Sequence, residues 1–294
     1  MFLSHLKPGD RVAVVAPSGT VPDIETVLAQ VRTFLARWQL EMVTYSDLIG
    51  THPTLPAIAH TDAVRAQDFM RAVQDDTVQA IWPLRGGYGV LRLLPYLDQL
   101  PKPTKHKWVI GFSDISLLHA YVNAQWGWPS VHGPNLRGTA TGHVAMEDVA
   151  ALQRGLCEGQ WGLPPDLRCV GIDGSALAQT TWVGGNLTVL SYVVGTPYAP
   201  VTHHRIVLLE DLAEPLRKLD GTLWHLYWGM QWEKYPPRAI VFGEFATVPE
   251  ETPEAVACLL QEWEGRLQGL GIGCAYTSLI GHGERNYPVV LGWH

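Results

Sequence analysis

Three residues of the chain are of the types that form a catalytic triad: Ser113, Glu210 and His282. Ser113 follows the apolar run 108–112, Glu210 follows the apolar run 206–209, and His282 lies between two glycines. A neutral imidazole can take the hydroxyl proton of a serine, while a carboxylate orients the ring and stabilises the imidazolium that forms. The three residues therefore suggest a nucleophile, an orienting carboxylate and a general base.

Each of these residues also has an ordinary structural interpretation. Ser113 precedes a helical pattern, so its hydroxyl can act as an N-cap. Glu210 can cap the segment that follows it, and His282 is one of 12 histidines. Glu214, four residues after Glu210, is a second carboxylate that the spacing allows as the partner of His282. We expect Glu210 in this role because it ends a strand.

Two turns offer backbone N–H groups to a developing oxyanion. Gly86 and Gly87 follow the apolar run 80–84, and a glycine lets the backbone approach a substrate closely because it has no Cβ. The N–H of Asp114 lies at the start of the helix after Ser113. Gly87 and Asp114 can therefore form an oxyanion hole. The alternative is a glycine turn that only lets the next helix pack.

Several other catalytic and binding patterns are missing. The stretch RGGYGVLR lacks the G-x-G-x-x-G spacing of dinucleotide sites, and the phosphate-loop pattern is absent. The run 111–115 lacks the second glycine of the α/β-hydrolase nucleophile turn, which disfavours that fold. The four cysteines show no C-x-x-C spacing, so we expect neither a zinc site nor a disulfide framework. We expect no metal and no organic cofactor.

Strands and helices alternate in the first half of the chain. Strand-like runs cover 11–16, 42–45, 80–84 and 108–112, and helical patterns cover 23–38, 61–73 and 90–97. This alternation indicates an open, mostly parallel α/β sheet, in which ligands bind outside the carboxyl ends of the strands. Gly87 and Ser113 both follow such ends.

The amino-acid composition of the chain changes near residue 160. Glycine and proline become frequent from 159 to 175, which indicates a linker. We predict an N-terminal α/β domain over residues 1–160, a linker over 161–178, and a smaller α/β or β-rich C-terminal domain over 179–294. Strands are expected over 205–209, 239–245 and 273–278 in the second half, with a helix over 215–232.

Composition excludes several classes of protein. The formal net charge is −7 and the basic residues are scattered, so nucleic acid is not an expected partner. No apolar run reaches 18 residues, so no membrane-spanning segment is expected. The first residues do not have the layout of a signal peptide, and the cytoplasm is the expected location.

Seven short motifs occur in an order that resembles one family, the serine LD-carboxypeptidases or murein tetrapeptide carboxypeptidases. They are LRGGYG at 84–89, GFSD at 111–114, HGPN at 132–135, WVGGNL at 182–187, GTP at 195–197, LED at 209–211 and GHGE at 281–284. The resemblance extends from Ala16 to Leu291. It implies that Ser113, Glu210 and His282 form the catalytic triad. It also implies a site between two domains and a homodimer.

The resemblance implies release of D-alanine from a peptidoglycan tetrapeptide, or muropeptide, through an acyl-enzyme. An exopeptidase must recognise a terminal carboxylate, for which arginine is suited. Four arginines lie near the motifs, Arg85, Arg137, Arg217 and Arg285, and the sequence does not choose among them. Trp182 is a candidate substrate contact.

Two other functions remain open. One is an amide hydrolase similar to the microcin C self-immunity peptidases, and the other is a catalytically silent binding protein on the same scaffold. The tryptophans Trp224, Trp228 and Trp232 recur every four residues, which predicts one face of a helix. We expect that face to be buried or to form a subunit contact, with sugar or peptide stacking as the alternative.

Overall fold

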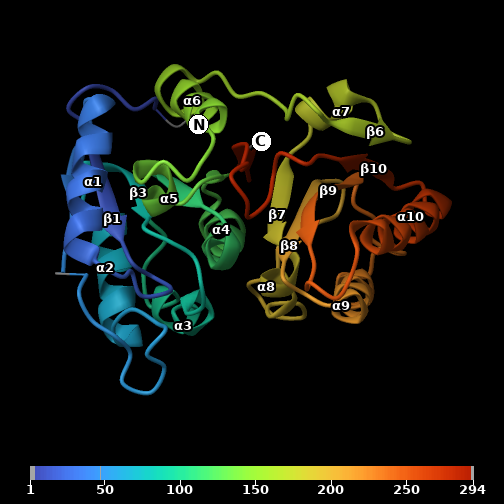
Figure 1. Cartoon of the computed structure of the whole chain (residues 1–294), viewed down its shortest axis with the longest axis horizontal. Helices are drawn as coiled ribbons and strands as arrows, with labels where there is room; N and C mark the ends of the chain where they lie inside the picture. Colours follow the sequence, from blue (N-terminus) through green and yellow to red (C-terminus); the bar gives the residue numbers. More distant parts are fainter. Residues whose placement is uncertain (1–3, 47, 293–294) are drawn as a thin grey trace.

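The computed structural model describes residues 4–46 and 48–292. The outermost residues of the two predicted domains, 1–3 and 293–294, lie outside the described residues. Two sheets stand side by side, each with helices packed against it (Figure 1).

The first sheet has the strand order β11-β5-β4-β3-β1-β2. The strands are β1 (Arg11–Val15), β2 (Glu41–Val43), β3 (Val78–Pro83), β4 (Trp108–Gly111), β5 (Ser130–His132) and β11 (Val289–Leu291). Neighbouring strands are parallel except for β11, which is antiparallel to β5. The last strand of the chain therefore completes the sheet that the first strand begins.

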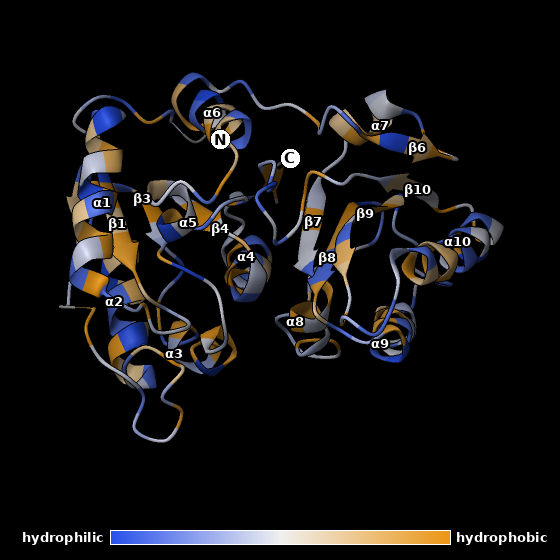
Figure 2. Cartoon of the chain, viewed as in Figure 1, coloured by the Kyte–Doolittle hydropathy of each residue, from blue (hydrophilic) through white to orange (hydrophobic). Residues whose placement is uncertain are grey.

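Helices cover both faces of this sheet. They are α1 (Ile24–Arg37), α2 (Asp62–Gln74), α3 (Leu94–Leu97), α4 (Ser116–Tyr121), α5 (Leu136–Ala140) and α6 (Met146–Gln153). Successive residues of a strand point to opposite faces, so a strand buried on both faces is apolar throughout. Accordingly, Val12 and Val14 pack in the core with α1, while Ala13 and Val15 pack with α2 and α4. Figure 2 shows β1 as hydrophobic and α1 as mixed.

The second sheet has the strand order β6-β10-β9-β8-β7. The strands are β6 (Arg168–Val170), β7 (Trp182–Asn186), β8 (Ile206–Leu212), β9 (Ala239–Ala246) and β10 (Gly273–Tyr276). Only β6 is antiparallel to its neighbour. The helices of this half are α7 (Gly174–Ala178), α8 (Leu187–Ser191), α9 (Leu216–Gly229) and α10 (Pro253–Gly269).

The two halves meet where α4 approaches β7 (Figure 1). The hydroxyl oxygen of Ser116 accepts a hydrogen bond from the backbone N–H of Asn186 at 3.0 Å. Gly185 has a φ of 136°, and a Cβ at this position would collide with the Ser116 hydroxyl. Glycine at 185 is therefore what lets the helix after Ser113 lie directly against the second sheet.

The predicted α/β class with a mostly parallel open sheet is confirmed. The domain limits remain a prediction, and β6 and α7 both lie within the residues expected to form a linker. The strand predicted over 205–209 is longer in the structure, because β8 continues through Glu210 to Leu212.

The prediction that three tryptophans share one helix face is wrong. Helix α9 ends at Gly229, and Trp232 lies beyond it, fully buried, where its indole N–H donates to the Thr202 hydroxyl oxygen at 3.2 Å. Trp228 is 65% exposed. Within the described residues, no helix combines the length and the hydrophobicity needed to cross a membrane.

Candidate active site

Ser113 occupies a strained turn between β4 and α4. Its φ is 64°, in the left-handed region that non-glycine residues seldom adopt and that costs about 1–3 kcal/mol. Such strain persists where the surrounding structure enforces it, and it often marks a functional site. The turn presents the Ser113 hydroxyl at the carboxyl end of β4, beside the 3₁₀ turn Ser113–Ile115.

The Ser113 turn has the space it needs because a glycine, Gly86, lies opposite it after the neighbouring strand β3. A Cβ on Gly86, which follows β3, would lie 2.8 Å from the Cβ of Ser113 and 3.0 Å from its Oγ. The sequence lacks the glycine two residues after the serine that α/β-hydrolases use. Gly86 supplies comparable space from the neighbouring strand.

Glu210 and His282 come from the second half of the chain and contact each other. The Nδ1 atom of His282, in the loop after β10, lies 2.7 Å from Oε2 of Glu210 in β8. Glu214 instead faces Lys218, with its Oε1 2.6 Å from the lysine Nζ. Of the two carboxylates that the sequence left open, Glu210 is therefore the one beside His282.

The pKa shifts of Glu210 and His282 are those expected of a carboxylate that orients a histidine base. Burial favours a neutral Glu210, but the imidazoles of His132 and His282 outweigh burial and lower the pKa of this carboxylate below its usual range. Burial also opposes protonation of His282, and the Glu210 carboxylate outweighs it and raises the His282 pKa above the ordinary 6.5. An ionised Glu210 thus stabilises the imidazolium that proton transfer would create.

Residues of both halves line one cavity of about 290 Å³. Its lining includes Gly87, Ser113 and His282, together with Arg85 and Arg137. The Phe112 ring packs edge-on against the His282 ring, with 4.8 Å between the ring centroids. The structure thus brings the predicted nucleophile, base and glycine turn to a single space.

The predicted oxyanion donors are Gly87 and Asp114. Gly87 lines the cavity with a φ of 123°, a conformation that favours glycine. Asp114 directly follows Ser113, and its carboxylate is buried. That carboxylate accepts hydrogen bonds from the Ser18 hydroxyl at 2.6 Å and from the Val90 N–H at 2.9 Å. Asp114 therefore ties the nucleophile turn to the end of the glycine turn.

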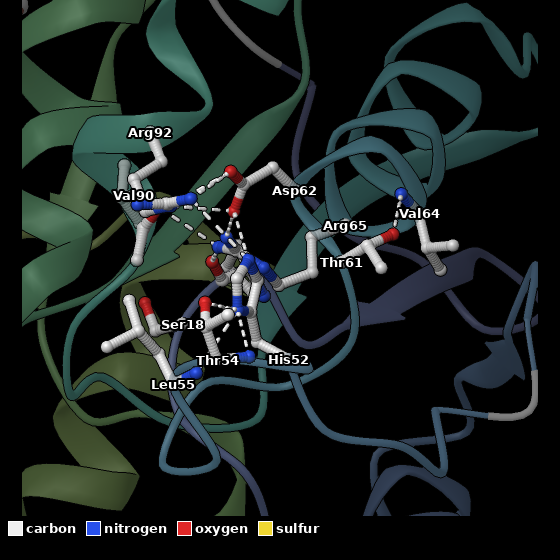
Figure 3. Close-up of polar contacts among 12 residues, drawn as sticks. Ser18, His52, Thr54, Leu55, Thr61, Asp62, Val64, Arg65, Val90 and Arg92 are labelled. Carbon is white, nitrogen blue, oxygen red and sulfur yellow. Dashed lines mark hydrogen bonds and ion pairs between the residues drawn. The ribbon is translucent and has the colours of Figure 1, made fainter.

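A buried arginine braces the same glycine turn from behind (Figure 3). Arg65 of α2 donates hydrogen bonds to the carbonyl oxygens of Pro17 and Gly89. Figure 3 also shows Asp62 facing Arg92, whose Nη2 lies 2.7 Å from the carboxylate. Sequence reasoning missed this network. The available signal was an arginine on the apolar face of an amphipathic helix, where it is 2% exposed.

The other predicted substrate contacts lie elsewhere. Trp182 lines a second cavity, between the 159–163 segment, α7 and β11, and its indole N–H donates to the Leu177 carbonyl at 2.9 Å. Arg285 forms a bidentate pair with Asp148, and Arg217 is exposed on α9. Arg85 and Arg137 are therefore the two candidate arginines that the structure brings to the Ser113 cavity.

Comparison with known proteins gives a consistent assignment. Residues 12–133 match the LD-carboxypeptidase N-terminal domain, and residues 179–294 match the LD-carboxypeptidase C-terminal domain. The chain is 28% identical over 297 residues to the murein tetrapeptide carboxypeptidase of Pseudomonas aeruginosa, covering 94% of this chain and 89% of that protein. A relative from Streptomyces coelicolor is 32% identical over 295 residues, covering 98% and 90%.

Solved structures share the fold at lower sequence identity. The muramoyltetrapeptide carboxypeptidase from Oxalobacter formigenes is 22% identical with a TM-score of 0.75, covering 96% of this chain and 92% of that one. The microcin C7 self-immunity protein MccF, in complex with aspartyl sulfamoyl adenosine, is 19% identical with a TM-score of 0.80, covering 99% and 94%. The matches over both halves show that the chain belongs to the LD-carboxypeptidase family and is a peptidase.

Proposed function

We propose that this protein is a serine LD-carboxypeptidase that removes the terminal D-amino acid, D-alanine, from peptidoglycan tetrapeptides. The observation that carries the proposal is the left-handed Ser113 in one cavity with His282, whose other side contacts the buried Glu210. The match to the LD-carboxypeptidase domains and the similarity to a murein tetrapeptide carboxypeptidase support the substrate class.

In the proposed reaction, His282 takes the proton of the Ser113 hydroxyl while Oγ attacks the carbonyl carbon of the L-centred residue. The N–H groups of Gly87 and Asp114 stabilise the oxyanion of the tetrahedral intermediate. The intermediate collapses as the carbon–nitrogen bond breaks, and His282 gives the proton to the departing amine. Water, deprotonated by His282, then hydrolyses the acyl-enzyme and restores Ser113.

The terminal carboxylate of the substrate is assigned to Arg85 and Arg137. Both line the cavity, and among residues 4–46 and 48–292 neither side chain is paired with a carboxylate. Burial, followed by the charge of Arg137, lowers the pKa of Arg85, as expected for two cations that face the same space. A planar guanidinium binds a carboxylate through two parallel hydrogen bonds.

The cytoplasmic location and the homodimer that the sequence led us to expect stay predictions.

The test is release of D-alanine from L-Ala-γ-D-Glu-meso-diaminopimelyl-D-Ala by the wild type and by Ser113→Ala. We expect kcat to fall by at least about 1,000-fold in the variant, because the reaction loses its nucleophile. Ser175→Ala is the matched control, since Ser175 is exposed on α7 and does not line the cavity. Equal release by wild type and Ser113→Ala would contradict the serine mechanism.

The same assay separates the alternatives. A folded wild type that leaves the tetrapeptide intact but cleaves an aminoacyl sulfamoyl-adenylate would replace the proposed substrate by that of the immunity-type hydrolases. A protein that binds the tetrapeptide without cleaving it would be a binding protein on this scaffold.

A further inference from the structure

A second imidazole faces the catalytic carboxylate. The Nε2 atom of His132 lies 3.7 Å from Oε1 of Glu210, whereas His282 contacts the other oxygen, Oε2. Both His132 and Glu210 are fully buried. His132 is held in place by β5, where it pairs with Gly111 of β4 and Val289 of β11.

The carboxylate has few other means of stabilisation. Among the described residues, His132 and His282 are the only side chains placed to pair with Glu210. A buried carboxylate without donors is strongly destabilised and takes up a proton instead. In the proposed reaction His282 must be neutral before it accepts the serine proton. At that stage the ion pair on Oε2 is lost, and His132 is the side chain beside Oε1.

We propose that His132 is a positioning residue, which shares the Glu210 carboxylate with His282 and stabilises it as an anion while His282 is neutral. The assignment of a role in turnover rests on the proposed function. His132 begins the HGPN motif at 132–135, but the proposed triad of Ser113, Glu210 and His282 assigns no role to it.

Glu210 is the charged side chain that lies beside His132. His119 of α4 has its ring centroid 6.5 Å from that of His132, and burial lowers the His119 pKa to about 3, so His119 is neutral. On the β7 side lies Gly185, where an added Cβ would come within 3.5 Å of His132 Cδ2. Beyond the Glu210 carboxylate, the acidic groups that act on His282 are Asp211 of β8 and Glu244 of β9.

The variants His132→Asn and His132→Gln separate the donor from the bulk of the ring. A glutamine amide nitrogen takes the place of Nε2, which faces Glu210, whereas an asparagine amide ends at the place of Nδ1. Loss of the imidazole nitrogen that faces Oε1 at 3.7 Å destabilises the state in which Glu210 is ionised and His282 is neutral. The Glu210–His282 pair therefore keeps its proton to a higher pH.

The measurements are the pH profile of kcat/KM for D-alanine release and the NMR titration of the His282 imidazole without substrate. In His132→Asn we expect the acid midpoint and the titration midpoint to rise by about one pH unit, with KM little changed. In His132→Gln we expect both midpoints to return most of the way to their wild-type values.

The control is His52→Asn, which removes a similar contact at a residue that does not line the cavity. His52 is also buried, with its Nε2 3.9 Å from the Asp62 carboxylate, and its Nδ1 accepts N–H groups of the next turn (Figure 3). This variant is expected to lower stability without moving either midpoint.

Unchanged midpoints in a folded His132→Asn would overturn the inference, and so would a His132→Gln midpoint raised by a full unit. If His132→Asn does not fold, His132→Leu takes its place, because it also removes the nitrogen that faces Glu210 and keeps an apolar side chain in the buried space. Unchanged midpoints in a folded His132→Leu would likewise overturn the inference. The NMR titration needs no turnover, so a wild type without peptidase activity would contradict the proposed function and leave the contact to His132 still testable.

Discussion

At the scale of single residues, the cavity beside Ser113 holds two arginines, neither of which pairs with a carboxylate within residues 4–46 and 48–292. Arg85 is anchored, because its Nη1 donates to the Thr20 carbonyl oxygen at 3.0 Å. Arg137 lines the same cavity from α5, and among the described residues no acidic side chain pairs with its guanidinium. This difference makes Arg137 the cleaner position for testing carboxylate recognition.

We predict that Arg137→Gln raises KM and lowers kcat/KM about 10- to 100-fold, the effect of losing one charge-assisted hydrogen-bonded contact. Steady-state kinetics on the tetrapeptide measure this. Arg217→Gln is the control, since Arg217 is exposed on α9 and away from the cavity. Equal KM values for wild type and Arg137→Gln would remove Arg137 from the carboxylate site.

At the scale of elements, the site is built where the turns after β3 and β4 touch. The glycine turn provides the space that lets Ser113 adopt its left-handed conformation, and in the proposed reaction it also supplies a backbone N–H group to the oxyanion. Asp114 and Arg65 fix the turn from two sides through Val90 and Gly89. The geometry of the nucleophile therefore depends on a neighbouring loop as much as on its own.

We predict that Gly86→Ala lowers kcat/KM by about 100-fold, the cost of displacing an oxyanion donor or the nucleophile. The added Cβ would lie 2.8 Å from the Ser113 Cβ and 3.3 Å from the Phe112 carbonyl oxygen, so one of the two turns must move. The kinetics are to be measured together with the melting temperature.

Gly265→Ala is the control for the same added methyl group. Gly265 lies inside α10, and a Cβ there meets no atom within 4 Å. Alanine should raise the free energy of unfolding by up to about 1 kcal/mol without changing kcat/KM. Wild-type kinetics in Gly86→Ala would show that the glycine turn tolerates the methyl group and does not control Ser113.

At the scale of the whole molecule, the proposed triad is divided between the two halves of the chain, so its geometry needs a fixed relation between them. The loop that carries His282 is fastened to the first half through Asp148 of α6. This fully buried carboxylate accepts two hydrogen bonds from Arg285, each 2.9 Å, and one from the Asn286 N–H at 2.8 Å. The loop then continues into β11 at the edge of the first sheet.

We predict that Asp148→Ala lowers the free energy of unfolding by about 1–3 kcal/mol, because the partly buried Arg285 and the Asn286 N–H lose their acceptor. It should also lower kcat, since the His282 loop loses its attachment to the half that carries Ser113. Urea titration and kinetics provide the two readouts.

Asp76→Ala tests the loss of an exposed ion pair instead. The Asp76 carboxylate lies 2.8 Å from Lys105 Nζ, and its side chain is 71% exposed, so the expected loss is at most about 1 kcal/mol. Equal stability changes in the two variants would contradict an anchoring role for Asp148.

Local patterns in the sequence were enough to predict the fold class correctly, and they supplied the residues on which the proposed chemistry rests. Apolar runs such as 108–112, followed by a helical pattern, predict a strand and a turn, because backbone geometry repeats over a few residues. The residue types Ser113, Glu210 and His282 narrow the chemistry because few other side chains can act as nucleophile, carboxylate and base.

These local patterns could not predict which residues from distant segments of the chain contact each other. Spacing allows both Glu210 and Glu214. The sequence favours Glu210 only through its place after an apolar strand, and the contact itself depends on where β8 and the His282 loop meet. Trp182 looked close to the site along the chain, but its side chain packs at another cavity. Neither the return of β11 to the first sheet nor the contact between His132 and Glu210 leaves a periodic signal. Such contacts join residues far apart in the chain, so they arise only when the two sheets pack together.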